Sequence, residues 1–77
     1  LTNRHVIVNA PLKNISVMLA DGRRLQPTAK WDDAGTDVAV MAVSADELTT
    51  ARLGNSDNVE IGDFVLAVGS PFGLAIP

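Results

Sequence analysis

His5 and Asp37 are the two residues of this chain whose types and surroundings could carry out proton-transfer chemistry. His5 is the only histidine in the sequence, and imidazole is the side chain best suited to transferring protons near neutral pH. Asp37 precedes a run of apolar residues, and a carboxylate in such a place must be solvated, hydrogen-bonded or paired with a cation. An imidazole would satisfy it, because a carboxylate beside an imidazole fixes the ring's tautomer and stabilises its protonated form.

Taken singly, each of these residues also has an ordinary structural explanation. A lone histidine near apolar residues is more often structural than catalytic, and a carboxylate at the start of a strand often belongs to the preceding turn. A metal site is a weaker explanation, because one histidine without cysteine or a second histidine supplies too few ligands. The residue types alone therefore leave the roles of His5 and Asp37 open.

The composition argues against several other classes of function. The 77 residues are enough for one small domain and not for two. The net charge of −3 argues against a nucleic-acid-binding protein, and the six basic residues are interpreted as solvated residues at strand ends. Without cysteine, this segment has no disulfide and no thiolate metal site. No apolar run approaches the roughly 18 residues of a membrane helix.

A hairpin is the first element expected to position the two candidate residues. Residues 15–19 alternate apolar and small side chains, Asp21 and Gly22 predict a turn, and residues 23–31 predict the returning strand. Pro27 has no N–H group, so this strand is expected to lie at a sheet edge or to carry a bulge there. Such a hairpin would fold the chain back between the two candidate residues.

Two apolar runs further along the chain predict strands. Residues 38–43 are apolar at every position, which is typical of a strand buried on both faces, and their three valines favour a strand over a short helix. Residues 64–68 predict a second strand of this kind. Short strands separated by turns favour an antiparallel barrel or sandwich. The remaining segments are predicted as a brief helical turn at 44–47, a loop at 54–58, an extended segment at 59–61, a turn at 62–63 and a loop at 69–73.

Both candidate residues lie in short segments that match known sequence motifs. Residues 2–6, Thr-Asn-Arg-His-Val, resemble the T-N-x-H-V segment around the general-base histidine of the HtrA/Deg family of chymotrypsin-like serine proteases. Residues 36–40 resemble the end of the D-x-x-[ST]-D-[LIV]-A-[LIV] segment that holds its triad aspartate, and either Asp32 or Asp33 could be the first aspartate of that segment. Further matches follow in the family's order: D-G-R at 21–23, L-G-x-S-x at 53–57, G-[DE] at 62–63, and a strand with an N-P-F-G loop that closes the barrel at 64–74.

The chain departs from the family pattern in three places. The aspartate segment is longer by one residue, Ser70 replaces the usual asparagine of the N-P-F-G loop, and the nucleophile segment G-N-S-G-G is absent. Ser56 lacks the two following glycines whose N–H groups would form an oxyanion hole. Ser70 is followed by Pro71, which has no N–H to donate. Both serines are therefore interpreted as loop residues.

The resemblance implies an all-β fold, an antiparallel β-barrel that forms the N-terminal half of a chymotrypsin-like double β-barrel. Residues 1–77 would be part of a serine protease domain, with the second barrel and the nucleophilic serine outside this chain. The resemblance makes His5 the general base and Asp37 its orienting carboxylate in a serine endopeptidase that cleaves unfolded or misfolded polypeptides. The 77 residues by themselves would then be inactive.

The resemblance also implies partners and a location. Polypeptides are the expected substrates, and neither a metal, an organic cofactor nor nucleic acid is required. Family members often form homotrimers and carry PDZ domains, and we expect a periplasmic or otherwise extracytoplasmic protein, with membrane association through segments outside this chain. The alternatives are a non-catalytic pseudoprotease that binds polypeptides as a chaperone, and an unrelated β-barrel binding domain. An intact His5 and Asp37 argue against the first alternative, and the ordered set of motif matches argues against the second.

Overall fold

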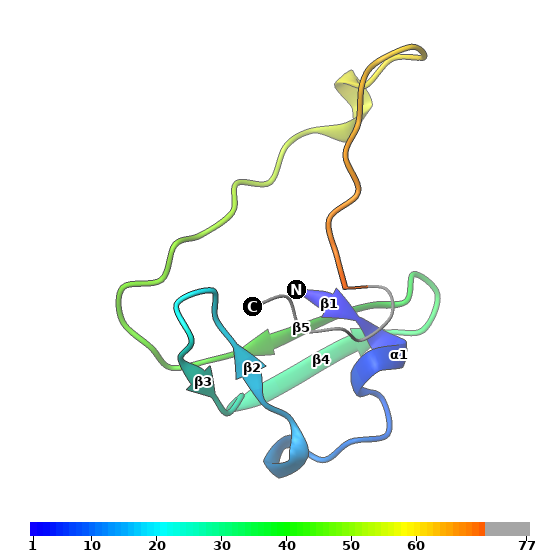
Figure 1. Cartoon of the computed structure of the whole chain (residues 1–77). Coiled ribbons are helices and arrows are strands. Elements are labelled where there is room, and N and C mark those ends of the chain that lie inside the picture. Colours follow the sequence, from blue (N-terminus) through cyan, green and yellow to red (C-terminus); the bar gives the residue numbers. More distant parts are fainter. Residues whose placement is uncertain (71–77) are drawn as a thin grey trace.

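Two small antiparallel sheets make up the regular part of the protein, which we describe from a computed structural model for residues 1–70 (Figure 1). The first sheet has the strand order β1-β5-β4, and the second pairs β2 with β3. The strands are β1 (Thr2–Asn3), β2 (Val17–Met18), β3 (Arg24–Leu25), β4 (Ala29–Asp33) and β5 (Val38–Ala42). Short helical turns are α1 (Arg4–Ile7), η1 (Leu12–Asn14) and η2 (Ser56–Asn58).

The expected antiparallel β-fold is confirmed, whereas residues 1–70 do not close into a barrel. Every strand pair of the described chain is antiparallel. The two sheets remain separate, with β1 and β4 as the outer strands of the larger one. Closure requires each outer strand to find a partner along its free edge, and the described strands do not supply one.

The β2–β3 hairpin confirms the turn at Asp21 and Gly22 but not the length of the returning strand. Val17 lies opposite Leu25, and Gly22 adopts a φ of 92°, a region in which the missing Cβ avoids a clash. The strand predicted over residues 23–31 is interrupted, because residues 26–28 belong to neither sheet. The buried Pro27 lies at this break. Because proline has no N–H to continue a ladder, the chain leaves the small sheet there and enters the large one.

The β5 strand confirms the prediction over residues 38–43, but burial on both of its faces does not occur. Ala39 is 1% exposed, whereas Val38 and Val40 on either side of it are 39% and 45% exposed. This alternation is typical of a strand with one covered face. The covered face lies towards α1, whose Ile7 is also buried.

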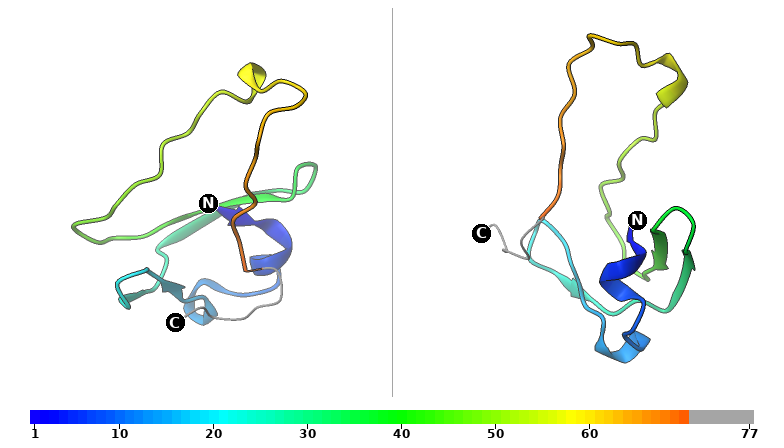
Figure 2. Two further views of the ribbon diagram at one scale, coloured as in Figure 1. Left: turned by 45° about the horizontal axis from the view of Figure 1, so that its top comes forward. Right: turned by 90° about the vertical axis from the view of Figure 1, so that its right-hand side faces the viewer.

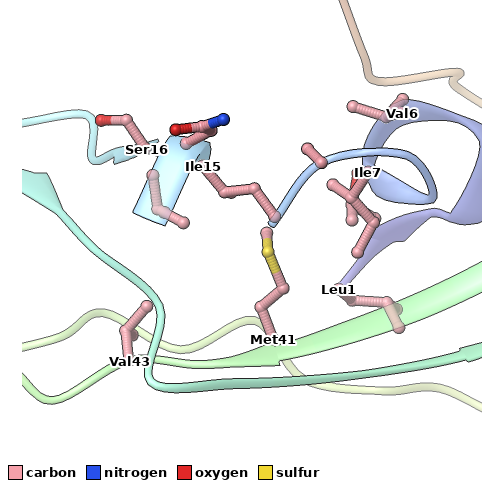
Figure 3. Close-up of a pocket in the computed structure, with 11 residues that line it drawn as sticks. Leu1, Val6, Ile7, Ile15, Ser16, Met41 and Val43 are labelled. Atoms are coloured by element: carbon pink, nitrogen blue, oxygen red, sulfur yellow. The ribbon is translucent and has the colours of Figure 1, made fainter. Parts of the chain in front are cut away.

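An apolar groove of about 460 Å³ lies beside this small core (Figure 3). It opens between α1, the segment around η1, β2 and the end of β5. In Figure 3 the side chains of Ile15 and Met41 point towards one another across the groove, with Ile7 and Leu1 at one end of it. The core of the described residues is therefore only partly filled.

Residues 44–70 leave the sheets and form an extended arm (Figures 1 and 2). The prediction of a helical turn at residues 44–47 is wrong, because these residues form no helix. The carbonyl oxygens of Asp46 and Glu47 accept hydrogen bonds from the Arg23 guanidinium at 2.7 and 3.2 Å. Glu47 also adopts a φ of 55°, which a right-handed helix does not allow. A contact with the β2–β3 hairpin thus sets the path of the chain where the arm begins.

The strand predicted at residues 64–68 is also absent. This run is extended, but it pairs with no other segment of the described chain, and Phe64 and Leu66 are almost completely exposed. A strand depends on a neighbour for its backbone hydrogen bonds, so an apolar sequence without that neighbour remains a single extended segment.

The local turns of the arm agree with the sequence. η2 lies within the loop predicted at 54–58, and the Asn55 side chain caps it by accepting from the Asp57 backbone N–H at 3.0 Å. At the predicted Gly62 turn, the Asp63 backbone N–H donates to the Glu60 carbonyl at 3.1 Å. The loop predicted at 69–73 lies largely outside the described residues. Within residues 1–70, no helix is long and apolar enough to cross a membrane.

Candidate active site

The ladder between β1 and β5 brings the two candidate residues together. Asn3 pairs with Val38, and one step further along the Arg4 backbone N–H donates to the Asp37 carbonyl at 2.9 Å. α1 begins at Arg4 and carries His5 on its first turn. The hairpin expected at residues 15–31 is therefore not the element that positions the pair, because the pairing of β1 with β5 does so directly.

A single carboxylate binds both the backbone and the ring of the histidine. The His5 backbone N–H donates to Asp37 Oδ1 at 2.8 Å, and His5 Nδ1 lies 2.6 Å from Asp37 Oδ2. The two side chains are 72% and 44% exposed, respectively. The two contacts fix the ring relative to the turn that precedes β5, although neither residue is buried.

Asp37 lies in the turn that precedes β5 and not in the strand itself. Its φ of 57° is in the left-handed region, which aspartate tolerates better than most residues. Its carbonyl accepts from the Asn3 side chain at 3.2 Å as well as from the Arg4 backbone. The backbone and the side chain of Asp37 therefore both face the segment that contains His5.

Asp33 stabilises the turn from its other end. Asp33 Oδ2 accepts hydrogen bonds from the Thr36 backbone N–H at 3.1 Å and from the Thr36 hydroxyl at 2.7 Å. Counted from Asp33, the residues up to Asp37 follow the D-x-x-[ST]-D spacing without an insertion. The spacing and these hydrogen bonds favour Asp33 as the first aspartate of that segment, whereas counting from Asp32 requires one inserted residue.

Hydrogen bonds hold the carboxylates of this turn in their ionised form. The pKa of Asp37 lies below its usual 3.8, first because the His5 side chain bonds it and second because the His5 backbone N–H does. The Thr36 hydroxyl and then the Thr36 backbone N–H lower the pKa of Asp33 in the same way. Asp37 is thus an ionised acceptor at neutral pH.

Two basic residues that the sequence suggested were solvated strand ends are engaged around α1. The Arg4 side chain pairs with Asp32 through Arg4 Nε and Asp32 Oδ2. Lys30 Nζ donates to the Ala10 carbonyl at 2.5 Å and contacts the Ile7 carbonyl at 3.4 Å. The signal in the sequence was the two-residue spacing of Lys30 and Asp32, which places both side chains on one face of a strand.

The geometry is suited to proton transfer at the second ring nitrogen of His5. With Nδ1 held by Asp37, Nε2 is the ring nitrogen that could exchange a proton with a further group. Ser56 lies in η2, on the extended arm. Within residues 1–70, no three of the histidine, aspartate and glutamate side chains are grouped so that they could hold a metal ion.

Comparison with known proteins agrees with the motifs around this pair. The whole chain, residues 1–77, matches the family described as "Trypsin-like peptidase domain". It is 47% identical over 74 residues to the "Probable periplasmic serine endoprotease DegP-like" of Pseudomonas fulva, covering 96% of this chain and 15% of that protein. It is 37% identical over 75 residues to the "Serine protease HTRA2, mitochondrial" of Drosophila erecta, covering 97% of this chain and 18% of that protein. No solved structure matches the chain.

Proposed function

Because this chain belongs to the trypsin-like peptidase family, as a segment of an HtrA/DegP-type serine protease domain, we propose that it supplies the general base and the orienting carboxylate of a serine endopeptidase. The observation that carries the proposal is the 2.6 Å contact between His5 Nδ1 and Asp37 Oδ2. This contact is made between the residues that the family motifs single out. The chain spans less than a fifth of the length of the curated relatives it matches.

In this mechanism the nucleophilic serine comes from residues outside the chain. His5 Nε2 accepts the proton of the serine hydroxyl as its oxygen attacks the scissile carbonyl, and later returns a proton to the leaving amine. Asp37 stays ionised, holds the ring with Nδ1 protonated and stabilises the imidazolium formed during attack. The lowered pKa of Asp37 supports this role, because a protonated carboxyl could not stabilise that cation.

We extend the proposal to the domain that surrounds the site. Residues 1–77 form part of one protease domain, in which strands outside the described residues complete a barrel around the β1-β5-β4 sheet. Within residues 1–70, the outer edges of β1 and β4 pair with no other strand, which supports this arrangement. The substrates are unfolded or misfolded polypeptides, and the parent protein works outside the cytoplasm as a homo-oligomer. The relatives are named as periplasmic or mitochondrial.

The first test is to read the source gene beyond residue 77. A downstream Gly-Asn-Ser-Gly-Gly or Gly-Asp-Ser-Gly-Gly segment, about one barrel's length away, would complete the triad. Replacement of that serine in an otherwise continuous second barrel would instead indicate a pseudoprotease that binds polypeptides.

The second test uses the full-length gene product and the His5→Ala variant. Cleavage of a reduced, unfolded protein should fall to background when the general base is removed. Cleavage that persists in His5→Ala at the wild-type rate would overturn the assignment. A Lys13→Ala variant, changed at an exposed position of η1, serves as the matched control and should cleave normally.

A further inference from the structure

α1, which carries His5, is too short to determine its own orientation. It spans four residues, and its closing hydrogen bond runs from the Val8 backbone N–H to the Arg4 carbonyl. A single turn is unstable in isolation, because nucleating a helix costs more than one hydrogen bond returns. The His5 side chain is 72% exposed, so close packing does not hold the imidazole ring, although Ile7 of the same turn is buried. Contacts from outside the helix must therefore fix the backbone that carries the ring.

Lys30 of β4 holds the C-terminal side of α1. Its Nζ donates to the carbonyl of Ala10 and reaches that of Ile7, and the lysine is partly buried there. Ala10 lies just beyond α1, and its backbone N–H donates in turn to the Ile7 carbonyl at 3.1 Å, so the ammonium group of Lys30 contacts both ends of this short link. This contact joins the end of the helical turn to β4, an outer strand of the larger sheet.

Asp32 of the same strand holds the start of α1 by pairing with Arg4. Lys30 and Asp32 are two residues apart, so both side chains leave β4 on the same face. Trp31 lies between them in the sequence and is 60% exposed, which is consistent with the opposite face. One face of one strand thus contacts both ends of the turn that carries His5.

We propose that Lys30 and Asp32 are positioning residues that hold α1, and with it the His5 ring, in register with Asp37. The expected effect on kcat rests on the proposed function, because it presupposes that the full-length protein cleaves peptide bonds. Neither residue contacts the reacting atoms. Asp37 fixes the ring through its side chain and the first backbone N–H of the turn, whereas Lys30 and Asp32 fix the path of the backbone on which His5 stands.

The kinetic test compares variants of the full-length protein. Lys30→Met keeps the aliphatic stem and removes the donor, and we expect kcat to fall about ten- to a hundredfold with KM unchanged, because small misplacements of a catalytic group are costly. Lys30→Arg should restore most of kcat, since it can still donate to the same carbonyls. Lys13→Met, an equal change at an exposed lysine of η1, should behave as wild type. Unchanged kcat in Lys30→Met would overturn the proposal.

A spectroscopic measurement tests whether Lys30 and Asp32 position His5 even if the proposed function is wrong. A proton shared between His5 Nδ1 and Asp37 should give a downfield proton resonance, assigned by its loss in His5→Ala. Lys30→Met and Asp32→Asn should both broaden or abolish it, even if the wild-type protein proves inactive as a protease. A sharp resonance in both variants would overturn the proposal. If Lys30→Met does not fold, Asp32→Asn decides the question alone.

Discussion

Two apolar runs of five residues show how differently similar sequences behave in this molecule. Val38–Ala42 forms β5 and is paired on both sides, by β1 and by β4. Residues 64–68, Phe-Val-Leu-Ala-Val, are equally apolar and pair with no segment of the described chain. The first run contains the buried Ala39, whereas in the second Phe64 and Leu66 lie in solvent. Composition made both runs candidates for strands, and the presence of neighbours decided which became one.

The same difference separates the two regions that contain these runs. Residues 1–43 are joined by ladders and by contacts between segments far apart in the sequence, including the contact of His5 with Asp37. The side-chain and turn hydrogen bonds of residues 50–63 reach only two or three positions along the chain. Long-range contacts are what can assemble a site from separate segments. The candidate active site therefore lies in the first region, although the arm also carries serine and carboxylate side chains.

The largest expected effect comes from exchanging one carboxylate in each region. In the full-length protein, Asp37→Asn should lower kcat by about 10⁴-fold, because the amide no longer holds the correct imidazole tautomer. Asp57→Asn makes the same change in η2 of the arm and should leave kcat unaltered. Initial rates on an unfolded protein substrate measure both. If Asp37→Asn kept more than a tenth of the wild-type rate, the pairing with His5 would not be the catalytic one.

A smaller effect is expected from enlarging one alanine in each region. Ala39→Leu places a larger side chain beneath α1, where the alanine is 1% exposed, and should lower the free energy of unfolding by about 1–3 kcal/mol. Ala51→Leu in the exposed start of the arm should change it by less than about 0.5 kcal/mol. Urea unfolding of the two full-length variants measures the difference. An equal loss at both positions would show that the arm is as closely packed as the sheet.

The smallest expected effect is on the pH dependence of stability. The pKa of Asp37 in the folded chain is below 3.8, because His5 bonds its carboxylate, so the unfolded chain binds more protons on acidification. The stability that this contact contributes is therefore fully present at pH values above about 3.8, the pKa of the unfolded chain. It is lost as the pH falls through the lower pKa that Asp37 has in the folded chain. Solvent exposure keeps the contribution small.

Urea unfolding at a series of pH values tests this last expectation in the full-length protein. Between neutral pH and a pH well below 3.8, the wild type should lose more stability than Asp37→Asn, which has no carboxylate to protonate at this position. Identical losses in the two proteins would mean that the contact with His5 does not stabilise the ionised form. The carboxyl carbon resonance of Asp37 should in addition titrate at higher pH in His5→Ala than in wild type.

Several features were predictable because they depend on a few adjacent residues. The turns at Gly22 and Gly62 follow from positions where a glycine allows a positive φ. An irregularity at Pro27 was expected from its missing N–H as an edge position or a bulge, but that the strand breaks there and the chain changes sheet required the structure. The motifs around His5 and Asp37 were visible in the sequence for the same reason, since each lies within a short segment.

Other features could not be predicted because they depend on which segments meet. β5 was expected to be buried on both faces, but only the side towards α1 is covered. The helical turn predicted at 44–47 does not form, and the carbonyl groups of Asp46 and Glu47 instead bind Arg23, which is distant in the sequence. Lys30 was interpreted as a solvated residue and Asp32 as a candidate first aspartate of the motif, until the structure placed α1 beside both side chains.

The sequence by itself determined the family, the local turns and the two residues that deserve testing as a catalytic pair, because short-range patterns carry that information. Only the tertiary structure decided that β1 lies beside β5, that one carboxylate therefore binds both the backbone and the ring of His5, and that residues 64–68 stay unpaired within the described chain. The physical reason is that a ladder or an ion pair between distant segments forms only when the fold brings both segments together. The sequence of either segment alone does not determine whether the other lies beside it.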